Sequence, residues 1–352
     1  EQNGYQDLLM LVFVSSIAIV SFRLMFLFKE GNIQVMALNL VLMPYSQCKS
    51  KNRSGLQHHV LQKIPLKFVN YLMTNNLYKT KFNDSISDRE KFWEEAAQDI
   101  FWFKKYSKVL NSDNPPFYKW FEGGKTNTCY NALDLHIHNG LGNKTALIYD
   151  SPLANSQQKL TYAEMLEKVS ILAGAILKSG VSKGDRVIIY MPMVPEAVIA
   201  MLACSRIGAV HSVVFGGFAA NELASRIDDS EAKLILTASC GIEPGRIIKY
   251  IPLISEALKI SNHKPEKIVV LQREQLNVEL DENFIEWNDF KKDASAVPCV
   301  EIDSNDPAYI LYTSGTTGTP KGIVRDTAGH IVALKWTMKN IYNINPDDVW
   351  WS

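Results

Sequence analysis

Residues 313–322 are the part of this sequence best suited to bind a phosphate group. Glycines in this segment let backbone N–H groups approach an anion closely, because no Cβ intervenes. Hydroxyl groups add hydrogen-bond donors, and a lysine adds a compact positive charge. The residues expected to hold phosphate are Thr313, Ser314, Gly315, Thr316, Thr317, Gly318, Lys321 and Gly322. The segment therefore predicts a nucleotide-phosphate site.

Two other interpretations of this loop are open to test against its residues. A Walker A loop needs GxxxxGK followed by Ser or Thr, whereas Pro320 precedes Lys321 and Gly322 follows it. That register excludes Walker A. A flexible Gly/Ser/Thr linker is the second interpretation. A strand is expected at 306–312, however, and linkers rarely lie between a buried strand and a Pro-Lys-Gly sequence.

Strands and helices alternate upstream of the loop. The expected strands are 185–191, 211–215, 233–238 and 267–271, and the expected helices are 161–178, 196–207, 221–228 and 247–260. Thr161 and Glu164 form a capping box for the first helix, and Gly180 follows its end. The strands are continuous apolar runs, as expected when both faces of a sheet are covered. The pattern predicts an α/β fold with a mostly parallel, doubly wound sheet, whose ligands bind beyond the carboxyl ends of the strands.

The first residues of the chain have a different character. Residues 8–28 are apolar apart from three serines and Arg23, which is long enough for a transmembrane helix. Arg23 lies near one end, where it can snorkel, and Lys29 would place the downstream side inside. A spurious translated extension or a damaged targeting segment is the alternative, since the segment is not an amphipathic, Arg-rich presequence.

A basic, polar linker is expected over 49–81, followed by a helix over 87–110. Ser87 and Glu90 have the spacing of a capping box at its start. Aromatic and small apolar residues then recur at helical spacing, which indicates core packing. The chain opens at Glu1 without an initiator methionine and stops inside an apolar run, which indicates a fragment or a defective gene model.

The composition does not favour a nucleic-acid-binding, disulfide-rich or zinc-binding protein. The 352 residues include 37 basic and 37 acidic side chains, so nothing favours a nucleic-acid partner. The five cysteines are widely spaced and form no CxxC pair, which predicts neither a disulfide scaffold nor a zinc site. His136 and His138 have a spacing that some metal sites use, but no further ligand pattern joins them. No metal site is predicted, and packing or surface roles are expected for all seven histidines.

Several further segments, taken with the loop, resemble one family. The loop resembles the signature of the adenylate-forming superfamily, which comprises acyl-CoA synthetases, luciferases and peptide-synthetase adenylation domains. The segments that resemble the acetyl/propionyl type of acyl-CoA synthetase are 120–134, 191–196, 203–218 and 241–246. Glu243 to Arg246, together with Asp150 to Pro152, are most similar to the propionate-preferring, often mitochondrial branch. The resemblance covers about residues 80–352.

The resemblance also implies where coenzyme A binds. Its nucleotide end is expected at Phe215, Gly216, Gly217, Glu243, Pro244, Gly245 and Arg246. The glycines permit close backbone approach, and an arginine can pair with phosphate in a bidentate manner. The alternative is that the two adjacent glycines form a tight turn and that Arg246 is a solvated charge. Two positions depart from the family: Glu243 stands where a second arginine is common, and Leu135 stands where an arginine usually follows the aspartate.

The implied activity is ATP-dependent activation of acetate or propionate to acyl-AMP and then acyl-CoA, with ATP, Mg²⁺ and coenzyme A as substrates and cofactors. The resemblance divides the chain into an apolar segment and linker (1–78), an acetyl-CoA synthetase-type N-terminal region (79–140) and an incomplete AMP-binding domain (141–352). The small C-terminal domain and the catalytic residues fall outside the match. The chain alone is therefore expected not to form acyl-AMP. The alternative is a non-catalytic nucleotide- or CoA-binding product, or a pseudogene fragment, tethered to a membrane through 8–28. The mitochondrial matrix is the location implied, with the cytoplasm or a membrane as alternatives.

Overall fold

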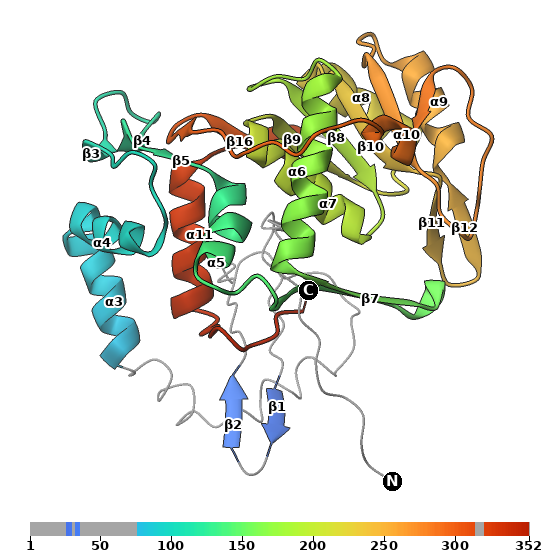
Figure 1. The fold of residues 1–352 in the computed structure, drawn as a ribbon. Helices are drawn as coiled ribbons and strands as arrows, with labels where there is room; N and C mark the ends of the chain where they lie inside the picture. The colour runs from blue at the N-terminus through green and yellow to red at the C-terminus, as the bar shows by residue number, and fades with distance from the viewer. Residues whose placement is uncertain (1–25, 30–31, 36–75, 314–319, 352) are drawn as a thin grey trace, which may run out of the picture. The chain divides into compact units, whose positions relative to one another are not determined.

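The computed structural model describes residues 26–29, 32–35, 76–313 and 320–351. These residues fall into two compact units. Figure 1 labels their helices and strands. The larger unit comprises 100–335 and 344–351, and the smaller comprises the described residues up to 99 together with 336–343. Of the apolar segment 8–28, residues 8–25 lie outside the described residues, and the strand β1 begins at Phe26. No helix among the described residues has both the length and the apolar character needed to cross a membrane.

In the described part of the chain, the larger unit is built around a seven-stranded sheet of order β14-β13-β10-β8-β9-β16-β17. Neighbouring strands are parallel from β14 to β16, and β17 runs antiparallel to β16. The strands are β8 (Arg186–Met191), β9 (Val210–Phe215), β10 (Leu234–Ala238), β13 (Lys267–Leu271), β14 (Phe284–Glu286), β16 (Pro307–Thr313) and β17 (Lys321–Asp326). The predicted mostly parallel sheet is confirmed.

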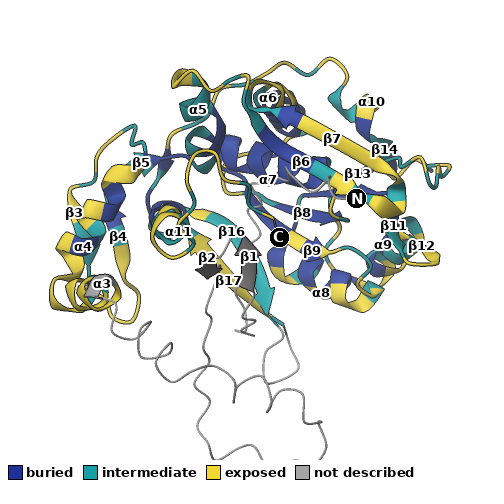
Figure 2. Cartoon of the chain, turned by 90° about the horizontal axis from the view of Figure 1, so that it is seen from below, coloured by how far each residue is buried: buried dark blue, intermediate teal, exposed yellow. Residues whose placement is uncertain are grey.

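Helices cover both faces of this sheet. α6 (Tyr162–Lys178) and α7 (Pro195–Ile207) pack on one face, and α8 (Ala220–Ser230) and α9 (Tyr250–Ile260) pack on the other. The central strand β8 shows why: Val187 and Ile189 join the first core, while Ile188 and Tyr190 join the second. Figure 2 shows this strand as buried between the layers, and only Arg186 at its start is partly exposed. The α/β sheet is therefore doubly wound, as predicted.

Local signals placed α6 correctly. The Thr161 side chain accepts from the N–H of Glu164, and Glu164 accepts from the N–H of Thr161 at 2.8 Å. The helix ends at Lys178, and Gly180 follows with a φ of +99°, which a side chain rarely adopts. The predicted capping box is confirmed because both of its hydrogen bonds form.

Smaller elements surround the main sheet. The two-stranded sheets pair β3 (Lys108–Asn111) with β4 (Lys119–Glu122), β5 (Lys125–Thr126) with β15 (Ile302–Asp303), β6 (Thr145–Ser151) with β7 (Ser156–Thr161), and β11 (Cys240–Glu243) with β12 (Arg246–Lys249). A π-helical turn, Tyr130–Asp134, leads into α5 (Leu135–His138). The remaining helices of this unit are the short turn Pro152–Ala154, α10 (Trp287–Lys291) and most of α11 (Ala328–Asn340).

The smaller unit contains α3 (Asn76–Ser87), α4 (Arg89–Ala96), the turn Ala97–Asp99, the hairpin of β1 (Phe26–Lys29) and β2 (Asn32–Val35), and the end of α11. Phe92 packs against Trp93 and Trp336 with ring centroids 5.2 and 5.4 Å away. Lys339 pairs with Asp99 at 2.8 Å. The aromatic residues of α4 therefore pack in a core, as their spacing indicated.

Two predicted helices had wrong boundaries, and the linker predicted over 49–81 was wrong at its end, where α3 (Asn76–Ser87) begins. The helix expected at 87–110 is α4, which ends at Ala96; its N-cap is Asp88, which accepts from the N–H of Lys91 at 3.1 Å. Ser87 instead closes α3, so it cannot cap a following helix with Glu90. The helix expected from 247 begins at Tyr250, because residues 246–249 pair with β11.

Candidate functional site

The predicted phosphate loop joins two strands of a β-hairpin. Thr313 at the end of β16 pairs with Lys321 at the start of β17, and Tyr312 pairs with Gly322. Ser314, Gly315, Thr316, Thr317 and Gly318 lie outside the described residues. β16 is parallel to β9, so Thr313 lies at the carboxyl edge of the sheet. A Walker A loop would lead into a helix, so the hairpin agrees with the exclusion made from the register.

Helix α8 contacts the loop end of this hairpin. The Tyr312 hydroxyl donates to Oδ2 of Asp229 at 2.6 Å. Burial and the neighbouring Asp229 carboxylate raise the pKa of Tyr312, so the phenol stays protonated and donates. A Cβ added to Gly322 would lie 3.1–3.3 Å from Ile310, Tyr312 and Asp229, tighter than ordinary contact. A side chain at Gly322 would therefore require these neighbouring side chains to shift by a few tenths of an ångström.

The first predicted coenzyme segment is a tight turn after β9. Phe215 is 69% exposed. A Cβ on Gly216 would overlap the hydroxyl of Tyr250, and Gly217 has a φ of +97°. The Gly217 N–H donates to the Tyr190 hydroxyl at 3.2 Å, and that hydroxyl donates to the Phe218 carbonyl at 2.8 Å. Both glycines thus have a structural requirement, and the turn presents an exposed aromatic ring.

The second predicted coenzyme segment is the turn of the β11–β12 hairpin. Glu243 and Arg246 pair across it, with the Arg246 Nε 2.7 Å and an Nη 2.6 Å from the same Glu243 oxygen. Both side chains are exposed. Gly245, which follows Pro244 and lies between the paired residues, has a φ of +77°. Arg246 is therefore accessible but is already engaged by a carboxylate.

The structure brings the two segments predicted to bind coenzyme A together around Tyr250. A Cβ on either Gly216 or Gly241 would overlap the Tyr250 hydroxyl. A Cβ on Gly217 would lie 3.5 Å from Ile248 of β12. Residues 215–217 and the β11–β12 hairpin therefore form one surface, although they are separate in sequence.

Gly216→Ala tests this packing. The added methyl would meet Tyr250 and lie 2.9 Å from the Met191 carbonyl. We expect a loss of about 1–3 kcal/mol in the free energy of unfolding, measured with urea, because the turn must move. Gly140→Ala is a poor control, since Gly140 has a positive φ. Gly142→Ala meets only ordinary contacts at 3.9 Å and should cost less.

A buried ion pair lies elsewhere in the larger unit. Arg206 of α7 forms bidentate hydrogen bonds to Asp134 at 2.8 and 3.1 Å and donates to the Val297 carbonyl at 2.6 Å. Burial opposes its charge and is the largest single influence, but the hydrogen bonds to Asp134 together with the neighbouring Cys129 and Cys299 outweigh it and raise the pKa of Arg206. Asp134 therefore keeps an arginine partner even though Leu135 replaces the arginine expected next to it.

Cys129, Asp134 and Cys299 are a set of metal-ligand types, with ligand atoms within 4.8 Å of one another. The Arg206 Nη1 lies 3.4 Å from the Cys129 Sγ and 3.1 Å from the Cys299 Sγ. The guanidinium supplies the positive charge at this point. We therefore interpret the set as a structural cluster. Cys129 and Cys299 are free thiols that lie beside each other in the fold. Their spacing in the sequence did not indicate this.

Four of the described histidines pack against aromatic rings. His211 stacks on Tyr309 with centroids 5.4 Å apart, and the Tyr309 hydroxyl lies 2.8 Å from the His330 Nε2. Burial lowers the pKa of His211 and of His330 to about 4 each. His136 packs on Tyr162, whereas the His138 Nδ1 lies 3.0 Å from the Tyr130 hydroxyl. These contacts agree with the packing roles expected from sequence.

This fold and this hairpin define the class to which the chain belongs. The chain is a member of the AMP-binding enzyme family, which it matches over residues 137–352. Residues 78–132 match the acetyl-coenzyme A synthetase N-terminus.

The chain is also similar to individual members of this family. The chain is 51% identical over 277 residues to the mitochondrial acyl-CoA synthetase short-chain family member 3 of Bos taurus, covering 78% of this chain and 40% of that protein. It is 41% identical over 284 residues to the acetyl-coenzyme A synthetase of Leptospira biflexa, covering 78% and 43%. The chain thus spans about 40% of the length of these curated relatives.

The fold is also that of a solved structure. Acetoacetyl-CoA synthetase from Streptomyces lividans superimposes with a TM-score of 0.69 and 24% identity, over 76% of this chain and 41% of that one. At this identity the similarity supports the fold alone.

Proposed function

We propose that this chain provides the ATP-phosphate and coenzyme A contacts of a short-chain acyl-CoA synthetase. The observation that supports the proposal is the pairing of Thr313 with Lys321, the described residues on either side of the glycine- and hydroxyl-rich segment, at the carboxyl edge of a doubly wound sheet. Acetate and propionate are the proposed substrates, because the relatives are named as short-chain and acetyl-coenzyme A synthetases.

The proposed reaction has two steps. A carboxylate oxygen attacks the α-phosphorus of ATP, acyl-AMP forms and pyrophosphate leaves. The coenzyme A thiol, losing its proton, then attacks the acyl carbonyl, and AMP leaves. Donors of the loop would stabilise the charge that develops on the departing β- and γ-phosphates.

Magnesium would enter with ATP and neutralise part of the phosphate charge. Asp229, a carboxylate beside the hairpin, already accepts from the Tyr312 hydroxyl. Mg²⁺ in nucleotide sites is held largely by phosphate oxygens and water. We therefore assign no protein ligand to it.

Lys321→Ala tests the phosphate site. Lys321 is exposed at the start of β17, so its loss should not unfold the protein. We expect binding of inorganic tripolyphosphate to weaken about tenfold, measured by titration calorimetry, because a charge-assisted contact is worth about 1.5–3 kcal/mol. Lys159→Ala, an exposed lysine of β7, is the matched control and should bind as the wild type does. Equal affinity in both variants would contradict the assignment.

Substitutions of Glu243 and of Arg246 are expected to change the affinity for coenzyme A in opposite directions. The Glu243 carboxylate competes with phosphate for the Arg246 guanidinium. We expect Arg246→Ala to weaken coenzyme A binding roughly tenfold and Glu243→Gln to tighten it about two- to fivefold, since like charge repels the polyanion. The affinities are to be measured by calorimetry at low salt. If Glu243→Gln weakens binding, the hairpin does not meet the phosphates as proposed.

Pyrophosphate exchange separates the enzyme from a binding protein. Exchange by the 352-residue chain with propionate or acetate would show acyl-AMP formation. Binding of both probes without exchange would favour a binding role for this chain. We propose a mitochondrial location, supported by the name of the bovine relative. Targeting of a fluorescent fusion tests it.

A further inference from the structure

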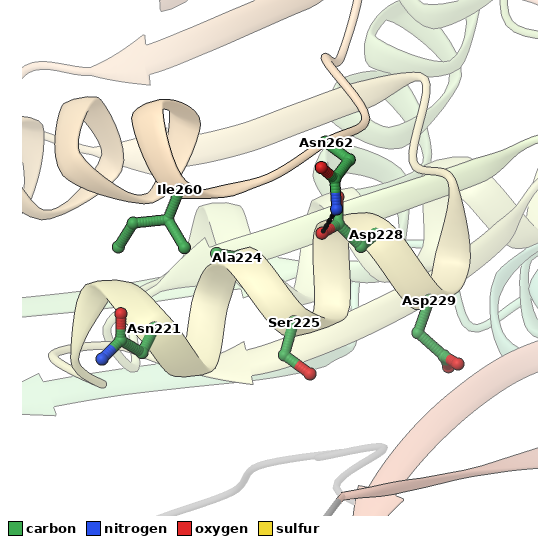
Figure 3. Close-up of a pocket in the computed structure, with 7 residues that line it drawn as sticks. All are labelled: Asn221, Ala224, Ser225, Asp228, Asp229, Ile260 and Asn262. Carbon is green, nitrogen blue, oxygen red and sulfur yellow. Dashed lines mark hydrogen bonds between the residues drawn. The ribbon is translucent and has the colours of Figure 1, made fainter.

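The two carboxylates of the hollow beside α8 already have partners within the chain. Figure 3 shows the residues that line this hollow, among which Asp228 points toward Asn262. Asn262 donates to Asp228 at 3.3 Å, and the N–H of His263 donates to it at 2.8 Å. Asp229 accepts from the Tyr312 hydroxyl at 2.6 Å. These carboxylates therefore hold α8 in the larger unit, and a more reactive pair of groups lies elsewhere in that unit.

Two free thiols share one site in the core of the larger unit. Cys129 is 0% exposed, whereas Cys299 is partly exposed. Their Sγ atoms and a carboxylate oxygen of Asp134 lie within 4.8 Å of one another. The Arg206 Nη1 lies 3.4 Å from the Cys129 sulfur and 3.1 Å from the Cys299 sulfur. Two cysteines that are far apart in the sequence therefore contact the same cation.

The side chain of Asn127 ties together the backbone beside the two cysteines. Its Oδ1 accepts from the N–H of Cys129 at 2.8 Å, and its Nδ2 donates to the Val300 carbonyl at 2.9 Å. The same amide donates to the Ser205 carbonyl at 2.9 Å. Asn127 is completely buried, where hydrogen bonds are stronger than they are in water. One side chain thus fixes the spacing between the two segments that carry the thiols.

The segment around Cys299 is also bonded to the helices that it crosses. Val297 donates its N–H to the Ser170 carbonyl of α6 at 3.2 Å, and its carbonyl accepts from the Arg206 Nε at 2.6 Å. Val300 donates its N–H to the Arg206 carbonyl of α7 at 3.0 Å. Bonds on both sides of Cys299 thus keep its backbone beside Cys129. A disulfide requires such proximity, because it joins Cβ atoms that are about 3.5–4.5 Å apart.

The charges at this site decide how the thiols react. A hydrogen bond to Cys129, followed by burial, raises the pKa of Cys299, while the Arg206 charge acts in the opposite direction. Cys299 therefore carries its proton at neutral pH and reacts through a small thiolate fraction. The Arg206 guanidinium stabilises negative charge on either sulfur. Because Cys299 is the more exposed of the two, a small oxidant reaches its sulfur first.

We propose that Cys129 and Cys299 form a redox-active dithiol, which hydrogen peroxide converts to an intramolecular disulfide with Cys299 as the first sulfur to be oxidised. The Cys299 thiolate attacks a peroxide oxygen, so that an S–O bond forms, the O–O bond breaks and the departing hydroxide takes the thiol proton as water. The Cys129 sulfur then attacks the sulfenic sulfur, so that the S–S bond forms and the hydroxyl leaves with the Cys129 proton as water. The two thiols together lose two electrons and two protons, and peroxide is reduced to two molecules of water.

The test treats the full 352-residue chain, folded and reduced, with a small excess of hydrogen peroxide. We expect the loss of two of its five thiols, measured by thiol titration after denaturation, and their recovery with dithiothreitol. Trypsin places the two cysteines in peptides 126–144 and 293–321, each of which holds a single cysteine. Mass spectrometry should detect these two peptides joined by a disulfide. The test needs neither ATP nor coenzyme A, so its result is independent of the proposed function.

Variants of the two cysteines test the order of oxidation. Cys299→Ser should slow the oxidation of Cys129 by about tenfold or more, since the Cys129 sulfur is completely buried. Cys129→Ser should leave Cys299 as a sulfenic acid that dimedone traps. The matched control is Cys204→Ser, which removes a buried thiol of α7 and should retain the disulfide. If Cys129→Ser fails to fold, Cys299→Ser decides the question, because its side chain is only partly buried.

Three outcomes would overturn the proposal. The first is a folded wild-type chain in which peroxide does not join peptides 126–144 and 293–321. The second is a disulfide that links either peptide to a third cysteine instead. The third is undiminished oxidation of Cys129 in Cys299→Ser, which would show that Cys299 is not the point of entry.

Discussion

Replacing Asp134 by alanine is expected to lower the free energy of unfolding by about 3–5 kcal/mol, since it leaves a buried arginine without its partner. The Arg206 side chain is 5% exposed and that of Asp134 is 14% exposed. Water therefore cannot replace the two hydrogen bonds that the carboxylate accepts. Urea unfolding followed by circular dichroism measures the loss.

The loss of stability in Asp134→Ala should come from the buried charge of Arg206, which then has no partner. Asp113→Ala removes an aspartate from an exposed pair with Lys108 and should cost less than about 1 kcal/mol. A double variant, Asp134→Leu with Arg206→Met, removes both charges and should recover much of the stability lost in Asp134→Ala. If the single and double variants are equally unstable, packing rather than charge explains the loss.

Acidification from pH 7 to pH 4.5 is expected to reduce the free energy of unfolding by roughly 2–3 kcal/mol for each of two buried histidines. Burial lowers the pKa of His211 and His330 to about 4, while an unfolded histidine has a pKa of about 6.5. Between these values the unfolded chain binds more protons than the folded chain, so stability falls as pH falls. Above pH 6.5 the two histidines are neutral in both states, so the stability that acidification removes is fully present there.

The groups around the two histidines set the size of this effect. After burial, the nearby Arg325 is the second cause of the lowered pKa of His330, and His330 is the second cause of the lowered pKa of His211. Burial raises the pKa of Asp326, so this carboxyl contributes in the opposite direction. The net slope should still follow the histidines, because two groups oppose one.

A variant isolates the histidine contribution. His211→Phe keeps an aromatic ring beside Tyr309 and removes one titrating group, so we expect about half of the histidine contribution to the pH dependence to disappear. His138→Gln, in α5 and outside this cluster, should keep the wild-type slope. Denaturant unfolding at several pH values gives both slopes, and identical slopes for wild type and His211→Phe would contradict the assignment.

Local patterns in the sequence predicted much of the fold because the physics they report is local. The capping box at Thr161 and Glu164 uses two residues of one turn, and it is confirmed. The continuous apolar strands are buried on both faces, as β8 shows. The same local logic failed at Ser87, where the adjacent Asp88 supplied a better cap.

The sequence by itself also excluded a Walker A loop at this position, because the register of Pro320, Lys321 and Gly322 is a property of neighbouring residues. The order of the strands was decided only in the tertiary structure, since β16 lies beside β9 and not beside the strand that precedes it in the chain. That order brings Tyr312 to Asp229 across 83 residues and Arg206 to Asp134 across 72. Neither contact has a spacing signature, because the side chains meet only after the sheet has brought their elements together.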